Sequence, residues 1–349
     1  MLQRFVIRRI IIAVFQLIGI SLAVFFLIRM LPADPVARIV GMNATPDIIA
    51  QAKASLGLDK TVLQQLGNYI GIFSDTKDPG ILEGSLGVSW VTGESITEEV
   101  GRFLPVTLEL ITYSLIIALL IAIPTGVVSA TRPGGIGDKI VFVWGLFAGS
   151  QPEFWWALIF VFFFFYWSFA LFGISIAPAP LGRLSPLTDA PDVITGFIVF
   201  DALIQGEFEA FVDAAWHLML PVGTLVFVVS GPIIKMVRQN MVRVLRSDYV
   251  LYARSCGLSS RTIGLYALRA AMAPAMTLIG IFYGFLLGGA VPVELIYSLG
   301  GLGEYSLRSI LYFDYPAIQG TVLTIAMVSL IIYLVIDILH AFIDPRVTY

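Results

Sequence analysis

Two residue types that build many catalytic and metal centres are nearly missing from this chain. Its 349 residues include one cysteine, Cys256, and two histidines, His217 and His340, which are far apart in the sequence. A single cysteine excludes an internal disulfide and a cysteine-rich metal site, and two distant histidines argue against a histidine-based metal centre or triad. The glycine-rich segments at 133–135 and 300–303 lack the Lys-Ser/Thr of a phosphate-binding loop, so the chain offers no such route to ATP hydrolysis.

Charged residues are also scarce. They make up 13% of the chain, whereas hydrophobic residues make up 58%, and the mean hydropathy is +0.90. A soluble domain has about 25% charged and roughly 45–50% apolar residues. The composition therefore indicates an integral membrane protein.

Six stretches have the ~20 mostly apolar residues needed to cross a hydrocarbon core of ~30 Å. The third is longer than a straight crossing needs and contains Gly149 and Pro152, so we expect a kink or tilt there. The apolar run 193–200 is too short to span and is expected to pack on the outer face of the bundle. The predicted fold is all-α, with six transmembrane helices at Ile10–Leu31, Leu104–Ala130, Ile140–Phe172, Trp216–Ile234, Met272–Leu295 and Ile318–Phe342.

The distribution of charge predicts that both termini are cytoplasmic, because basic residues concentrate in cytoplasmic loops. The first apolar stretch is too long for a signal peptide and lacks a small-residue cleavage site, so we expect a retained helix. Loop 173–215 has six acidic residues and a single base, Arg183. The loop after the first helix also has more acids than bases, so both loops are expected outside. The bases assigned to the cytoplasm include Arg4, Arg8, Arg9, Arg132, Lys139 and Arg346.

These assignments divide the chain into three parts. Residues 1–31 form the N-terminal end and the first helix, and residues 32–103 form an outer loop with amphipathic helices. Residues 104–349 form a core of five helices, with outer loop 173–215 and cytoplasmic loop 235–270. In the first outer loop, Thr45-Pro46-Asp47 predicts a helix start, with Gly57 as its end, and a second amphipathic helix is expected from Thr61 to Phe73.

Acids within membrane spans are candidates for functional sites, because a charge in the bilayer is costly. Glu109, Glu294 and Asp337 lie near the ends of their spans, where we expect them to be hydrated. Glu153 follows Pro152 and either lines a polar path or bonds to backbone groups freed by the proline. Glu153 and Glu294 are our candidates for the translocation pathway.

The cytoplasmic loop 235–270 is the most distinctive segment. It contains seven bases and one acid, and Gly257 and Leu258 interrupt what otherwise reads as two helices. A helix–Gly–helix segment on the cytoplasmic side is expected to be a binding surface for a soluble partner. Its charged residues are Lys235, Arg238, Arg243, Arg246, Arg254, Arg261, Arg269 and Asp248.

Short motifs spread over nearly the entire chain, in order, resemble one family. The chain resembles the inner-membrane permease subunits of peptide-importing ABC transporters, in particular the first of the two permeases in dipeptide and oligopeptide systems. The motifs include the segments 29–35 (RMLPADP), 84–89 (GSLGVS), 104–110 (LPVTLEL), 217–221 (HLMLP), 253–258 (ARSCGL) and 344–346 (DPR).

The resemblance implies the type I ABC importer permease fold, in the inner (plasma) membrane of a prokaryote. It implies that the chain is half of a pathway for di- or oligopeptides, beside a second, homologous permease. An external solute-binding protein would deliver the substrate. Two ABC ATPase subunits would bind ATP and Mg²⁺, so this chain would be no enzyme and would hold no cofactor, metal or catalytic residue. No nucleic-acid partner is expected.

In this family the short helix at the glycine of the cytoplasmic loop docks on an ATPase subunit. The family's Glu-Ala-Ala signature aligns here with Leu251-Tyr252-Ala253, so its acid is missing unless Asp248 replaces it one turn earlier. The coupling residues that the resemblance implies are Tyr252, Ala253, Arg254, Gly257, Leu258, Ser259 and Arg261.

Three alternatives remain open from the sequence. The same architecture imports nickel, glutathione or oligosaccharides in related systems. A secondary transporter or channel would predict inverted repeats and buried ionisable pairs, and neither is evident. A membrane-embedded enzyme would need a clustered acid, base or metal set within the spans, which the sequence lacks.

Overall fold

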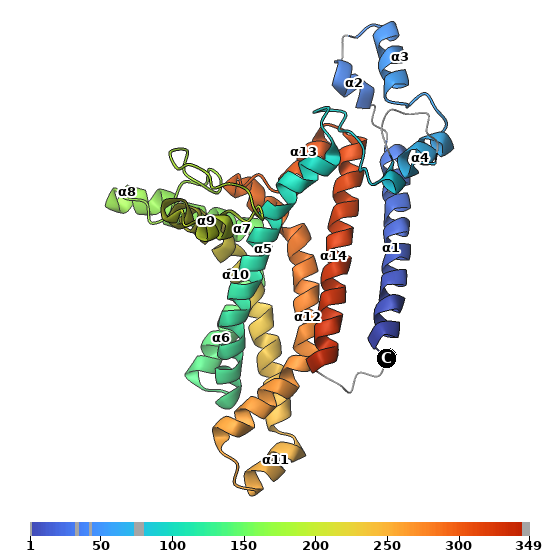
Figure 1. Cartoon of the computed structure of the whole chain (residues 1–349). Helices are drawn as coiled ribbons and strands as arrows, with labels where there is room; N and C mark the ends of the chain where they lie inside the picture. Colours follow the sequence, from blue (N-terminus) through green and yellow to red (C-terminus); the bar gives the residue numbers. More distant parts are fainter. Residues whose placement is uncertain (1, 32–34, 42–43, 73–79, 344–349) are drawn as a thin grey trace. The chain divides into compact units, whose positions relative to one another are not determined.

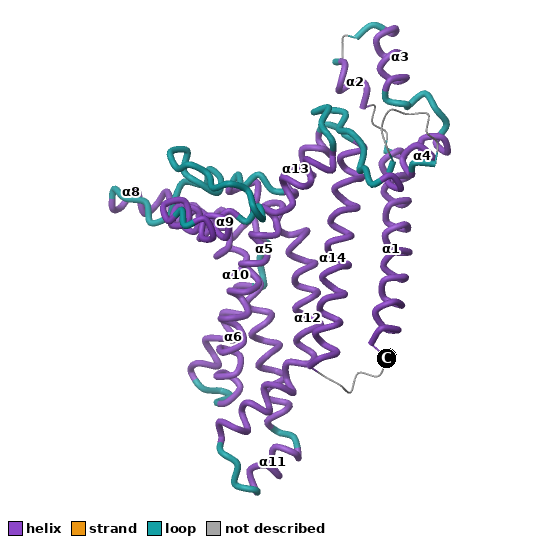
Figure 2. The backbone as a smooth tube through the Cα atoms, in the orientation of Figure 1, coloured by secondary structure: helices purple, strands orange, loops and turns teal. Residues whose placement is uncertain are grey.

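The computed structural model describes residues 2–31, 35–41, 44–72 and 80–343. These residues form helices and loops, with one isolated antiparallel bridge between Val88 and Ser95 (Figure 2). Two residues named in the predictions, Phe73 and Arg346, lie outside the described ranges. The helices in chain order are α1 (Leu2–Met30), α2 (Pro35–Val40), α3 (Pro46–Ser55), α4 (Val62–Ile70), α5 (Ile96–Thr131), α6 (Ile136–Ala148), α7 (Glu153–Phe160), α8 (Ser168–Phe172), α9 (Ile198–Gln205), α10 (Phe208–Leu245), α11 (Asp248–Ser255), α12 (Ser260–Tyr297), α13 (Leu302–Leu311) and α14 (Tyr315–Ile343) (Figure 1).

Within the described residues, six helical segments are long and apolar enough to cross a membrane, as the sequence predicts. The all-helical, six-span expectation is therefore confirmed. The segments are Val6–Met30, Ile96–Thr131, Glu153–Phe172, Phe208–Leu245, Pro274–Tyr297 and Tyr315–Ile338.

The third predicted span, Ile140–Phe172, is wrong as a continuous helix. Helix α6 ends at Ala148, and a non-helical link through Gly149 and Pro152 separates it from α7. Proline has no N–H to donate to the preceding turn, and glycine is a poor helix former, so the chain breaks rather than kinks. After α7 the helix continues through a π-helical segment, Val161–Trp167, into α8, and this second part is the membrane-length one.

The chain divides into two compact units, Met1–Val106 with Gly300–Leu330, and Thr107–Leu299 with Ile331–Tyr349, called unit 1 and unit 2. In unit 1, Ile96 and Val100 at the start of α5 pack with Leu302, Tyr305 and Ala317 of α13 and α14. These five buried side chains join the start of α5 to α13 and α14, two consecutive helices that come much later in the sequence.

The short helices of unit 1 start where the sequence indicates, but α4 ends at Ile70, before the predicted end at Phe73. Thr45 is the N-cap of α3 and Pro46 its first residue. Thr61 forms a capping box with Gln64 at the start of α4, and Gly71 ends that helix with a left-handed φ of 90°. Both helices therefore have local signals that fix at least one end.

Unit 2 is built around α10, which contacts α6, α7, α9 and α12. Small residues allow the closest approaches. A Cβ built on Gly231 of α10 would lie 3.2 Å from the Cα of Gly145 in α6, and one on Gly126 of α5 would lie 2.9 Å from the Cβ of Val237. Glycine at these positions lets helix backbones approach where a larger residue would clash.

Candidate functional site: the α11–α12 elbow and the buried carboxylates

Helices α11 and α12 meet in a tight turn. We call residues 248–263, which contain this turn, the elbow (Figure 1). Gly257 has a left-handed φ of 78°. Its N–H donates to the carbonyl of Arg254 at 2.9 Å, and the N–H of Leu258 donates to the carbonyl of Ala253 at 3.2 Å. This pair of bonds is a Schellman motif, which ends a helix at a left-handed residue, usually glycine.

The second helix of the elbow starts immediately. The hydroxyl of Ser259 accepts a hydrogen bond from the N–H of Thr262 at 3.2 Å and so caps α12. Because the C-terminal cap of α11 and the N-terminal cap of α12 are adjacent, only Cys256–Ser259 separate the two helices. The turn is therefore specified by local hydrogen bonds rather than by a core.

The elbow exposes apolar side chains. Leu251 is 66% and Tyr252 73% exposed, and Leu258 at the turn is also exposed, whereas Val250 on the same helix is buried. Contiguous apolar surface on an otherwise polar tip is typical of a binding surface. One face of α11 thus packs within the protein, and another is exposed.

Two cations flank this apolar surface. Arg254 and Arg261 are exposed, and their side chains form no ion pair or hydrogen bond within the described part of the chain. The structure brings all of the coupling residues that the sequence suggests into this one elbow. They are Tyr252, Ala253 and Arg254 on α11, Gly257, Leu258 and Ser259 in the turn, and Arg261 in the first turn of α12.

Glu153 is the first residue of α7, with Pro152 as the N-cap, and its side chain is nearly buried. No hydrogen bond joins its carboxylate to backbone groups among the described residues. The carboxylate instead faces α12, where its Oε1 lies 3.0 Å from the position that a Cβ on Gly289 would occupy. A carboxylate at a helix N-terminus is a favourable arrangement, because the helix dipole is positive there.

Glu294 and Glu109 are not hydrated, contrary to the expectation from their positions near the ends of spans. Both side chains have 0% exposure. Glu294 on α12 accepts a hydrogen bond from the hydroxyl of Thr107 on α5 at 2.5 Å. Hydropathy locates these carboxylates near the ends of their spans, but it does not show which neighbouring residues cover them. Asp337 is partly exposed.

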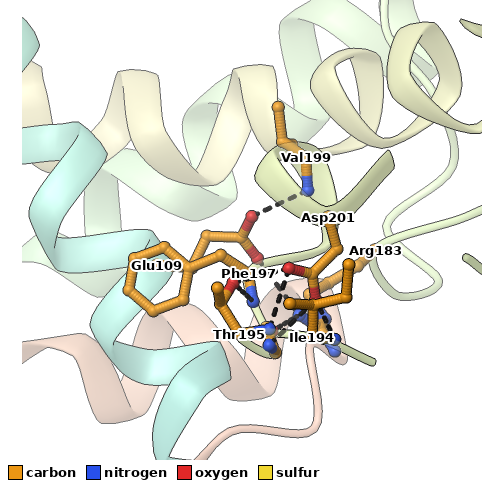
Figure 3. A network of polar contacts seen from close by, with 8 residues as sticks. Glu109, Arg183, Ile194, Thr195, Phe197, Val199 and Asp201 are labelled. Carbon is orange, nitrogen blue, oxygen red and sulfur yellow. Dashed lines mark hydrogen bonds and ion pairs between the residues drawn. The ribbon is translucent and has the colours of Figure 1, made fainter. Parts of the chain in front are cut away.

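Glu109 of α5 binds residues of loop 173–215. Its Oε2 accepts a hydrogen bond from the guanidinium of Arg183 at 3.1 Å, and its Oε1 accepts one from the N–H of Val199 at the start of α9 at 3.0 Å (Figure 3). Arg183 also donates to the carbonyl of Gly196 at 3.2 Å. The only base of loop 173–215 is therefore used to neutralise a buried acid, which the charge count of that loop did not reveal.

Asp201 of α9 organises the same segment. It accepts hydrogen bonds from the N–H groups of Ile194, Thr195 and Gly196 and from the Thr195 hydroxyl, at 2.6–3.2 Å (Figure 3). Burial acts to raise the pKa of Asp201, but these hydrogen bonds outweigh it and hold the pKa below the usual aspartate value. We call residues 183–201 the strap, since Glu109 binds Arg183 at its start and Val199 near its end.

Sequence reasoning missed a second ion pair with a buried carboxylate, at the start of α6. Asp138 forms an ion pair with Arg238 of α10, in which Nη2 lies 2.7 Å from Oδ2. It also accepts hydrogen bonds from the N–H of Gly134 at 2.7 Å and the hydroxyl of Ser129 at 2.5 Å. Arg238, Gly134 and Ser129 hold the pKa of Asp138 well below its usual range. The sequence signal that could have revealed this pair is a single acid, Asp138, among bases assigned to the cytoplasmic side.

Comparison with known proteins agrees with this architecture. The family described as "Binding-protein-dependent transport system inner membrane component" matches residues 122–349, and the corresponding N-terminal family matches residues 1–111. The chain belongs to this family. It is an inner-membrane component that crosses the membrane several times, and such systems work with a substrate-binding protein and an ATPase.

Individual relatives match over almost their full length. The chain is 35% identical to the Di/tripeptide transport system permease protein DppB of Pseudomonas aeruginosa, over 99% of this chain and 98% of that one. It is also 35% identical to the Dipeptide transport system permease protein DppB of Escherichia coli K12, over 100% and 99%. The protein of the same name from Alkalihalophilus pseudofirmus is 35% identical over 98% of each chain.

Proposed function

We propose that this chain is the permease subunit of an ATP-driven importer of di- or oligopeptides, and that the elbow transmits motion from an ATPase to the membrane helices. The observation that carries the proposal is the elbow itself. Leu251, Tyr252 and Leu258 offer an apolar contact, and Arg254 and Arg261 offer charges without partners in the described structure. A partner with an apolar cleft rimmed by acids would match this surface.

The proposed transmission follows from how the elbow is connected. Helix α10 leads into α11 through two residues, and α12 leads out of the elbow without interruption. Helices are hydrogen-bonded rods, so displacement of the elbow moves both at once. Tyr252, Ala253, Arg254, Gly257, Leu258, Ser259 and Arg261 are the residues assigned to this contact.

The proposed substrate is a short peptide, because the relatives named above are dipeptide and di/tripeptide permeases over their full length. An external solute-binding protein would release the peptide at the loops proposed to lie outside, 32–103 and 173–215. The pathway would form between this chain and a second, homologous permease, with Glu153 lining it. Glu294 remains a pathway residue only if its bond to Thr107 opens during transport.

In this proposal two ATPase subunits supply ATP and Mg²⁺ binding, and both termini lie in the cytoplasm with the elbow. Among the described residues no group of three or more His, Cys, Asp or Glu side chains could hold a metal ion. In this proposal the residues of this chain bind and move the peptide and contact the partner subunits.

The sole cysteine of the chain allows a direct test of the elbow. Cys256 lies in the turn and is exposed. A short thiol-to-amine cross-linker should join Cys256 to an ATPase subunit in the assembled transporter, with a yield that changes when ATP is added. The matched control carries Cys256→Ser and Leu187→Cys, which moves the cysteine to an exposed position of the strap. Equal cross-linking of both proteins to the ATPase would refute the assignment.

A further inference from the structure

Unit 1 contains a cavity of about 640 Å³ that the proposed transmission does not use. Small-molecule sites in proteins have volumes of about 300–1,000 Å³. Its wall comes from the end of α1, from α4 with the segment before it, from residues 80–90 and from the start of α14. The residues that line the cavity include Arg29, Lys60, Asn68, Tyr69, Trp90 and Gln319.

Among the described residues that line the cavity, the charged ones are all basic. They are Arg29 and Lys60, and no aspartate or glutamate of the described ranges is among the lining residues. Arg29 is held in place, since its Nε donates to Gln65 at 2.8 Å, its Nη1 donates to the carbonyl of Phe25 and its guanidinium stacks on the Phe25 ring. Lys60 has no ion pair or hydrogen bond of its ammonium group within the described ranges. A cavity with two cations and no acid favours an anion.

A second observation points to a missing acceptor. Gln319 of α14 is 3% exposed and lies in the cavity wall. Its amide nitrogen has no hydrogen-bond partner in the described structure. A buried polar group without a partner costs about 1–3 kcal/mol, so such groups are rare unless a ligand or water completes them. An anion in the cavity would supply the acceptor that Gln319 lacks.

We propose that this cavity is a binding site for the terminal carboxylate of a short peptide, separate from the translocation pathway. The carboxylate would be held by Lys60, the free face of Arg29 and the amide of Gln319. The aromatic rings of Tyr69 and Trp90 would provide apolar surface for the rest of the molecule. The choice of a peptide as the source of the carboxylate rests on the proposed function, whereas the anion site rests on the cavity alone.

Photolabelling of the assembled transporter, without the external binding protein, tests the location. The probe is a tripeptide with a diazirine side chain and a free carboxyl terminus. Label should appear in peptides covering residues 54–69, 80–90 or 316–319, and excess trialanine should remove it. The same probe with a C-terminal amide should label these residues at least about tenfold less. Label found only elsewhere, or equal labelling by acid and amide, would overturn the proposal.

Two variants separate binding from folding. Gln319→Leu removes the unpartnered amide, so we expect an equal or higher melting temperature together with about tenfold weaker probe binding. Lys60→Gln should weaken binding by a similar factor. Arg102→Gln is the charge-matched control, because Arg102 is exposed, pairs with Glu94 and does not line the cavity. Unchanged probe affinity in both cavity variants would contradict the assignment.

The remaining outcomes distinguish this inference from the proposed function. If ATP-dependent peptide uptake occurs but the cavity is not labelled, the inference fails and the proposed function stands. If the cavity is labelled but no peptide is imported, the carboxylate site stands and the proposed function fails. If phosphatidylglycerol in the nanodisc abolishes labelling that neutral lipid permits, the site takes a lipid phosphate and the proposal for peptide is wrong.

Discussion

Gly257 has a backbone conformation that residues with a Cβ adopt at a cost of about 1–2 kcal/mol. A Cβ there would meet no atom within 4 Å, so the strain comes from the backbone and not from a clash. Gly257→Val should therefore distort the elbow and leave membrane insertion intact. We expect ATP hydrolysis to continue while peptide uptake per ATP falls several-fold, measured in proteoliposomes that contain the complete transporter.

Gly257→Asn is the matched control for this prediction, because asparagine tolerates the left-handed conformation better than valine does. It adds a side chain of similar bulk at the same exposed position. We expect it to retain most of the uptake. Loss of coupling in both variants would mean that the surface at Gly257, and not the backbone angle, is what matters.

Asp138 provides a prediction on stability and its pH dependence. Asp138→Asn leaves Arg238 without its charge partner, and because Arg238 is partly exposed we expect a loss of about 2–3 kcal/mol. The folded pKa of Asp138 is below its unfolded value of about 3.9, so its contribution is complete above that pH and is lost as pH falls further. The difference in melting temperature between wild type and variant should therefore shrink below about pH 4.

An exposed ion pair on the surface provides the control for Asp138→Asn. Glu94 and Arg102 form an ion pair in which both side chains are about half exposed. Exposed pairs contribute about 0–1 kcal/mol, so Glu94→Gln should change the melting temperature little at any pH. A similar loss in both variants at pH 7 would show that Asp138 and Arg238 have no special role.

The contact between Arg183 and Glu109 gives a prediction on the stability of the strap. Arg183→Gln leaves Glu109, which is fully buried, with only the N–H of Val199 among the bonds described above. An uncompensated buried charge destabilises its surroundings, so the strap should open more often. Hydrogen exchange of residues 183–199 should accelerate at least about tenfold, while exchange in α10 stays unchanged. Arg102→Gln again serves as the exposed-arginine control, and equal exchange in both proteins would contradict this role.

The elements differ in how far the sequence could predict them. The elbow was predictable, because Gly257 and the polar residues around it act through local hydrogen bonds. The α6–α7 break was predicted only as a kink, since Gly149 and Pro152 weaken a helix without saying whether neighbouring helices will hold it together. The strap was not predictable, because Arg183 and Glu109 are separated by 74 residues and their contact depends on tertiary packing.

The burial of the acids within the spans was not predictable from the sequence either. Hydropathy places Glu109 and Glu294 near the ends of spans, where water is close. The loop that covers Glu109 and the threonine that binds Glu294 come from other parts of unit 2. Burial of these groups is thus a property of the assembled unit and not of the segments that contain them.

The lengths of α10 and α12 connect the elbow to the membrane. Each has 38 residues, which corresponds to about 57 Å at 1.5 Å per residue. A hydrocarbon core is only ~30 Å thick, so each helix is long enough to continue well beyond it. Asp138 ties α6 to α10 through Arg238, seven residues before the end of α10. In the proposed mechanism a push on the elbow is therefore passed to α6 as well.

In the proposed function the energy for transport comes from the ATPase subunits, which leads to the last prediction. The two permeases reconstituted in liposomes without ATPase subunits should carry no peptide against a gradient. Adding the ATPases, the external binding protein and ATP should start uptake, and a non-hydrolysable ATP analogue should not sustain it. Continued peptide accumulation by the permeases alone would mean that the buried carboxylates couple transport to another gradient, as in a secondary transporter. Variants of the elbow would then leave uptake unchanged, whereas Glu153→Gln would abolish it.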